Sequence, residues 1–155
     1  MKRWLYPLVG LLAIAFLSGK GTSRTDVAKL RPVEVVVVTC SEKIIKIQTD
    51  TGDVGVGEDL TQAVEQLKTT TPAEIFLETA EYLLISEECR SMVPELMEYL
   101  RPSCSVCILE GEPEMDNVGT FLKIHGLEVT LTEYKAGLCD LQTLREKEGR
   151  LELVS

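Results

Sequence analysis

Residues 81–110 read EYLLISEECRSMVPELMEYLRPSCSVCILE, and this stretch decides the fold. Apolar runs near its two ends, at 82–85 and 103–110, are short and bounded by polar residues, which predicts buried strands. Between them, apolar residues recur at helical spacing, and Ser86 is a suitable residue to begin a helix. Pro94 lies inside this helical segment and predicts a kink or a restart, because proline removes a backbone donor. We therefore expect a strand–helix–strand unit here.

The sequence upstream continues the alternation of strands and helices. The valine-rich residues 32–39 and the alternating residues 42–49 predict two strands, joined by a turn at Cys40-Ser41. The glycine-rich residues 50–57 predict a bend. The next segment, residues 58–68, predicts a helix, because its apolar residues share one helical face. These residues are Leu60, Ala63, Val64 and Leu67.

The sequence downstream predicts two more helices and a hairpin. One helix is expected to open at 111–113, with Pro113 near its first turn, and to end at His125-Gly126. A short helix is expected over 130–134. Residues 141–154 predict a terminal hairpin that turns at Glu148-Gly149.

These elements predict one α/β (α+β) domain. We expect a mixed sheet of about four to six strands, flanked by about three to four helices. The chain of 155 residues is long enough for one such domain. We place it at residues 32–155 and interpret the polar residues 22–31 as a linker.

The first 21 residues have the layout of an export signal. Lys2 and Arg3 precede an apolar run at 5–17, and small residues follow this run. The run is short for a membrane span, which needs about 20 apolar residues. The segment is therefore interpreted as a signal peptide or an N-terminal membrane anchor, and cleavage and anchoring both stay open. Either way, the domain is expected at the extracytoplasmic face of the cell membrane.

The end of this segment is similar to a bacterial lipoprotein signal. Leu17-Ser18-Gly19 is what precedes the lipidated cysteine of such signals, but the next residue here is Lys20. Lysine has no thiol to accept the lipid. We therefore expect membrane association through the N-terminus, without lipidation.

The charge balance bears on the class of partner. The chain carries a formal charge of -9, and its first 21 residues contain bases but no acid, so the rest is more acidic still. Nucleic-acid binding needs a basic face to replace counterions on phosphates. We therefore expect protein partners and no nucleic acid.

Asp50-Thr51-Gly52 matches the catalytic tripeptide of aspartic proteases. Those enzymes need two such aspartates that share a proton, and the sequence has one copy of the motif. Aspartate and glycine are also the residues of a tight bend, so we interpret the tripeptide as a turn. The single histidine, His125, is expected to end a helix. No catalytic, cofactor-binding or metal-binding residue is predicted.

Cys104 and Cys107 form a CxxC motif inside the predicted strand at 103–110. Thioredoxin-like sites place this motif at a helix start, where the thiolate is stabilised. Residues three apart on a strand point to opposite faces, so these thiols are not expected to meet. Buried, unreactive cysteines are the favoured interpretation, and a disulfide with a more distant cysteine stays open. The other three cysteines are Cys40, Cys89 and Cys139.

Residues 74–113 resemble the N-terminal domain of Ger(x)C spore germination lipoproteins, which are the C subunits of germinant receptors in endospore-forming bacteria. The shared pattern is an apolar strand that closes with Ser-Glu-Glu, a helix that ends in a Leu-Arg element, and a second strand. The corresponding parts here are residues 82–88, 93–101 and 105–109. The resemblance covers the first domain of that family only, and Lys20 stands where the family has its lipidated cysteine.

The resemblance implies a scaffold or interaction role, with membrane germinant-receptor subunits as partners. We therefore expect a non-enzymatic, exported, membrane-associated protein-interaction module that acts in spore germination or sporulation. Exposed acids of residues 87–100, such as Glu95 and Glu98, are expected to contact the partner. The alternative function is an exported thiol/disulfide-active protein that uses Cys104 and Cys107.

Overall fold

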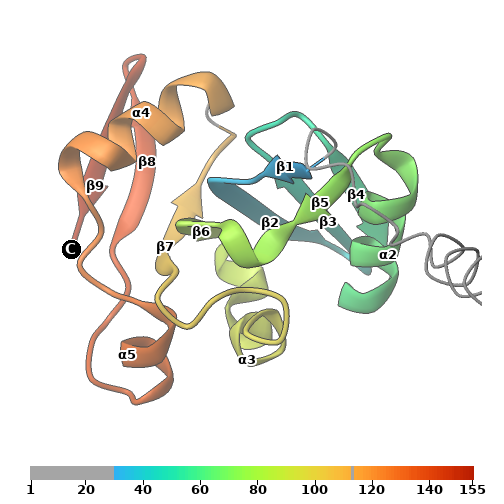
Figure 1. Ribbon diagram of the computed structural model, residues 1–155. Coiled ribbons are helices and arrows are strands. Elements are labelled where there is room, and N and C mark those ends of the chain that lie inside the picture. Colours follow the sequence, from blue (N-terminus) through green and yellow to red (C-terminus); the bar gives the residue numbers. More distant parts are fainter. Residues whose placement is uncertain (1–29, 113) are drawn as a thin grey trace, which may run out of the picture.

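The computed structural model describes residues 30–112 and 114–155. Its main sheet has seven strands in the order β4-β3-β2-β6-β7-β8-β9 (Figure 1). The four central strands run parallel, while β3, β4 and β9 are antiparallel to their neighbours. The strands are β2 (Val35–Ser41), β3 (Ile44–Thr49), β4 (Val54–Gly57), β6 (Tyr82–Ile85), β7 (Ser105–Glu110), β8 (Thr143–Lys147) and β9 (Arg150–Val154). The predicted α/β class with a mixed sheet is confirmed, and the sheet has more strands than expected.

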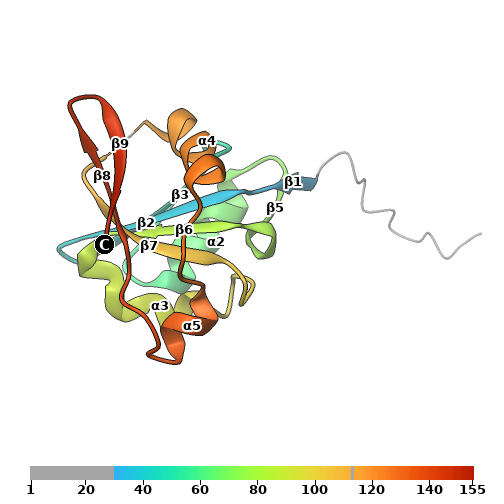
Figure 2. The same ribbon diagram turned by 90° about the vertical axis from the view of Figure 1, so that its left-hand side faces the viewer.

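Helices cover the two faces of this sheet unequally. Helix α4 (Met115–His125) lies on one face, while α3 (Val93–Leu96) and α5 (Leu131–Lys135) lie on the other (Figure 2). Helix α2 (Leu60–Thr70) shares the face of α3 and packs on β4, at the end of the sheet opposite the β8–β9 hairpin (Figure 1). Two short 3-10 helices, η2 (Leu77–Thr79) and η3 (Glu87–Met92), follow β5 and β6.

A second, small sheet pairs β1 (Leu30–Pro32) with β5 (Glu74–Phe76) in parallel. Leu30 and Arg31, the last two residues of the linker predicted at 22–31, lie in β1. Pairing with β5 satisfies backbone groups that a free linker would expose to water. The rest of that linker and the segment interpreted as a signal or anchor lie outside the described residues. No helix among the described residues is long and apolar enough to span a bilayer.

Local sequence signals explain where the helices begin and end. Asp59 caps α2 by accepting a hydrogen bond from the Gln62 N–H at 2.8 Å. Thr130 and Glu133 form a reciprocal capping box at the start of α5. The expected restart at Pro94 is confirmed, because η3 ends at Met92 and α3 begins at Val93.

Two predicted turns and the predicted start of one helix differ from the structure. The hairpin between β2 and β3 turns at Glu42 and Lys43, so Cys40 and Ser41 belong to β2. Residues 50–57, expected to be a bend throughout, contain β4 after a turn. The helix expected to open at 111–113 begins at Met115 instead.

Close packing of α2 explains the glycines of β4. A Cβ added at Gly55 would lie 2.1 Å from the carbonyl oxygen of Ala63 and 2.7 Å from the Cβ of Leu67. Only glycine allows this approach, and its presence hid the strand from a propensity-based prediction. The valines that alternate with the glycines face the other side of the sheet.

The central strand β6 is buried on both faces. Leu83 and Ile85 pack in the core under α2, α3 and α5, whereas Leu84 packs in the core under α4. All three side chains are fully buried. The prediction of a central strand at 82–85, covered on each side, is confirmed. The terminal hairpin is also confirmed, with its turn at Glu148 and Gly149 in the left-handed region.

Candidate functional site

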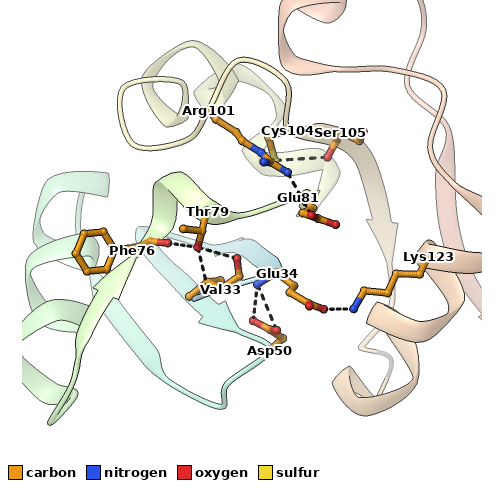
Figure 3. Close-up of polar contacts among 10 residues, drawn as sticks. All are labelled: Val33, Glu34, Asp50, Phe76, Thr79, Glu81, Arg101, Cys104, Ser105 and Lys123. Carbon is orange, nitrogen blue, oxygen red and sulfur yellow. Dashed lines mark hydrogen bonds and ion pairs between the residues drawn. The ribbon is translucent and has the colours of Figure 1, made fainter. Parts of the chain in front are cut away.

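A set of polar contacts joins the amino ends of the parallel strands to their surroundings (Figure 3). Asp50 accepts hydrogen bonds from the backbone N–H of Glu34, at 3.2 and 3.3 Å from its two carboxylate oxygens. The Glu34 carboxylate in turn pairs with Lys123 of α4, and this hydrogen bond raises the pKa of Lys123. Asp50 therefore acts as a joint between the β3–β4 turn and the start of β2.

The tripeptide Asp50-Thr51-Gly52 forms a tight turn, as the sequence suggested. The Gly52 N–H donates to the Thr49 carbonyl at 3.0 Å, and Gly52 has a φ of +84°, a conformation that favours glycine. The Thr51 hydroxyl donates to the Asp53 carboxylate at 2.6 Å. These hydrogen bonds stabilise the turn itself and connect it to the backbone of Glu34.

The remaining contacts in Figure 3 are also of a structural kind. The Thr79 hydroxyl of η2 accepts from the Val33 N–H at 3.0 Å and lies 2.7 Å from the Phe76 carbonyl oxygen. Arg101 pairs with Glu81 at 3.6 Å, with both side chains substantially exposed. These contacts fix η2 and the strand ends, and they do not enclose a cavity.

Cys104 and Cys107 lie on opposite faces of the sheet. Cys104 belongs to the core under α3 and α5, and Cys107 belongs to the core under α4. Burial raises the pKa of each thiol to about 12. A thiol with such a pKa stays protonated near neutral pH, and the thiolate is the nucleophilic form. This placement is the one that strand alternation predicted, and it opposes a dithiol site.

The disulfide of the structure joins Cys40, at the end of β2, to Cys89 of η3, with Cα atoms 5.6 Å apart. Cys139 is exposed and free. The sequence left the cysteine pairing open. The proximity of Cys40 and Cys89 is visible only in three dimensions, because the parallel strands β2 and β6 end at the same edge of the sheet.

His125 is the last residue of α4, and its ring lies 4.3 Å from that of Phe121. Gly126, with a φ of +69°, ends the helix, as predicted. Across residues 30–112 and 114–155, no group of three or more histidine, cysteine or acidic side chains is placed to hold a metal ion.

The most distinctive surface is the part of the sheet beside α4, over β2, β3 and β4. The strand register brings Gln48 between Val37 and Val54, and Lys46 between Thr39 and Val56, all on the α4 side. Three aliphatic side chains of this side remain exposed: Ile44 (52%), Val54 (36%) and Val56 (39%). We call this surface the open face; it comprises Thr39, Ile44, Lys46, Gln48, Val54 and Val56, and it borders Val37, which is buried under α4.

Thr39, Lys46 and Gln48 of the open face line a hollow of about 490 Å³, together with the buried Val37. The start of α4 and the loop before it form the opposite rim, which is acidic. Its acids are Glu112, Glu114 and Asp116. Among the described residues that line the hollow, Lys46 is the one base, and it belongs to β3. The hollow thus combines apolar side chains, an acidic rim and a central cation.

The edge of the sheet beside the open face is partly covered by α2. Gln66 of α2 accepts a hydrogen bond from the Val56 N–H of the edge strand β4, and Gln62 accepts one from the Glu58 N–H. An edge strand normally presents unpaired backbone groups to a further strand. Here α2 occupies part of that edge. The face of the sheet is therefore more accessible to a partner than the edge.

The acids expected to contact a partner lie elsewhere. Glu95 and Glu98 are exposed, but the predicted helix over 87–100 is broken into η3 and α3. Glu98 and Tyr99 line a second hollow of about 500 Å³ against β5. The sequence missed the open face in part, because it predicted a strand at 42–49 but a bend over Val54 and Val56.

Comparison of the chain with protein-family models, with curated proteins and with solved structures gives no match. The assignment of the open face as a candidate functional site therefore depends on its geometry alone.

Proposed function

We propose that the chain is a non-enzymatic protein-interaction module, exported and associated with the extracytoplasmic face of the cell membrane through residues 1–21, that acts in spore germination or sporulation. The open face carries this proposal. Exposed aliphatic side chains gathered on one face and bordered by polar residues are typical of interaction sites. The resemblance to Ger(x)C proteins supports membrane germinant-receptor subunits as the partners.

Two further features support the proposed location. The basic and apolar residues of the first 21 positions are typical of an export signal. A Cys40–Cys89 disulfide is what an oxidising compartment outside the cytoplasm would favour. A fusion of residues 1–31 to an export-dependent reporter should be active, and an inactive reporter at normal expression would contradict export.

A photo-crosslinking residue placed at Gln48 in the full-length chain tests the interaction role. Gln48 lies on the open face between Val37 and Val54, whereas Thr69 is exposed on α2 and serves as the matched control position. We expect a discrete protein adduct in cells from Gln48 and none from Thr69, and Ile44→Asp should abolish it. Absence of an adduct at Gln48, or equal adducts at both positions, would contradict the proposal.

The thiol-dependent alternative makes the opposite prediction for the buried cysteines. A binding module should keep its cellular phenotype in Cys104→Ser with Cys107→Ser, and in Asp50→Asn, provided that the fold survives. Formation of the Cys40–Cys89 disulfide, measured by thiol labelling, reports the fold independently. Loss of the phenotype in a folded variant would favour an enzymatic function.

A further inference from the structure

We propose that the open face binds an amphipathic helix of the partner protein, and that this helix carries basic residues on the flank that faces α4. This inference rests on the proposed function and specifies the partner's chemistry. It follows from the width of the open face, the partly covered edge of β4 and the distribution of charge around the hollow.

The width of the open face matches one helix. Neighbouring strands lie about 4.8 Å apart, so β3 and β4, with Thr39 at the end of β2, present a surface about 10 Å wide. A helix with its side chains is also about 10 Å across. On the same side, α4 already packs over the adjacent part of the sheet through Val118 and Leu122. A second helix beside α4 would complete the layer over the exposed Ile44, Val54 and Val56.

A strand is a poorer occupant than a helix. Strand addition needs free backbone groups along an edge, and on β4 the Val56 N–H is already bonded to Gln66. The face, in contrast, offers side chains alone. Side chains on a sheet face are covered by an apolar stripe at helical spacing, which an amphipathic helix supplies.

The charges of the hollow select the polar side of that helix. Glu112, Glu114 and Asp116 stand on the rim toward α4, so lysine or arginine on the facing flank would be favoured. Lys46 lies under the helix and favours a carboxylate or an amide oxygen above it. A second copy bound face to face would set one acidic rim against another, and an anionic lipid headgroup would meet the same repulsion.

The test is photo-crosslinking from Gln48 in the full-length chain, in cells, followed by identification of the crosslinked peptide. We expect a peptide from another protein, with apolar residues at helical spacing and a basic flank. The triple variant Glu112→Gln, Glu114→Gln and Asp116→Asn should lower the adduct yield about tenfold, because charge complementarity raises the rate of association. Glu74→Gln, Glu78→Gln and Glu98→Gln remove the same charge from the second hollow and should leave the yield unchanged.

The outcomes separate this inference from the proposed function. An adduct on an acidic or strand-forming segment of a partner would overturn the basic helix and leave the interaction role standing. An adduct on a lipid, on residues 1–29 of this chain or on a second copy would also overturn it. A rim variant that crosslinks as well as the wild type would do the same. The Asp116→Asn single variant, with disulfide formation as its measure of folding, covers the case in which the triple variant does not fold.

Discussion

The two faces of the main sheet are built from the same strands, but helices cover them to different extents. On one face, α2, η3, α3 and α5 pack over a core that extends from β3 to β7. On the other face, α4 covers the middle of the sheet, and the exposed aliphatic side chains of β3 and β4 lie beyond it. Both faces are equally buried at β6, so the difference is confined to the flank.

This difference teaches that adjacent residues of one strand have different roles. In β3, Ile45 and Ile47 point into the covered core, while Ile44, Lys46 and Gln48 point to the open face. Substitutions of the first kind should lower the free energy of unfolding. Substitutions of the second kind should leave it unchanged and affect binding alone.

The largest effect is expected at the centre, where the two faces are alike. Leu83→Ala and Leu84→Ala should each lower the free energy of unfolding by about 2–5 kcal/mol, because each removes a fully buried aliphatic side chain. Denaturant midpoints at equal slope would measure this. A much smaller cost for Leu84→Ala would show that the core under α4 is loosely packed. The two faces of the sheet would then already differ in packing at β6.

Removal of the disulfide, which lies on the covered face, should have the next largest effect on stability. Cys40→Ala with Cys89→Ala should cost about 2–4 kcal/mol, because the bond restricts the unfolded chain across 49 residues. Cys139→Ala is the matched control, since this thiol is exposed and free, and should have no effect on the midpoint. An unchanged midpoint in the double variant would mean that the bond does not form in the folded protein.

Two glycines test the contact of a helix with each face. Gly55→Ala should lower stability by about 1–3 kcal/mol, because its Cβ would enter the α2 backbone. Gly119→Ala in α4 meets its nearest atom at 3.6 Å and should raise stability by about 0.5–1 kcal/mol, through better helix propensity. Thermal midpoints of the two variants should therefore move in opposite directions. Equal losses would indicate that α4 packs as closely on the sheet as α2 does.

The sequence predicted the covered face well and the open face poorly, for a physical reason. The apolar stripe of Leu60, Ala63, Val64 and Leu67, the central strand at 82–85 and the Glu148-Gly149 turn are local signals, and the structure confirms them. The open face depends on which strands become neighbours. Its valines come from a strand whose glycines are explained only by α2, which lies next to it in space.

The cysteines show the same limit. Alternation along β7 placed Cys104 and Cys107 on opposite faces, and the structure confirms this local inference. The Cys40–Cys89 bond, in contrast, depends on the parallel pairing of β2 with β6, which the sequence does not reveal. Local periodicity predicted the elements, and tertiary pairing created both the disulfide and the candidate site.

The smallest effect on stability is expected on the open face itself. Ile44→Thr replaces a half-exposed side chain with another β-branched residue, which keeps the preference for a strand, so stability should change by no more than about 0.5 kcal/mol. Ile47→Thr is the matched control in the same strand. It removes apolar volume from the covered core and buries a hydroxyl, so it should cost about 2–4 kcal/mol. The crosslink from Gln48 should nevertheless weaken in the Ile44 variant, because the partner loses an apolar contact. A large loss of stability in Ile44→Thr would mean that this side chain is already covered in the folded chain, and the open face would then be part of the core.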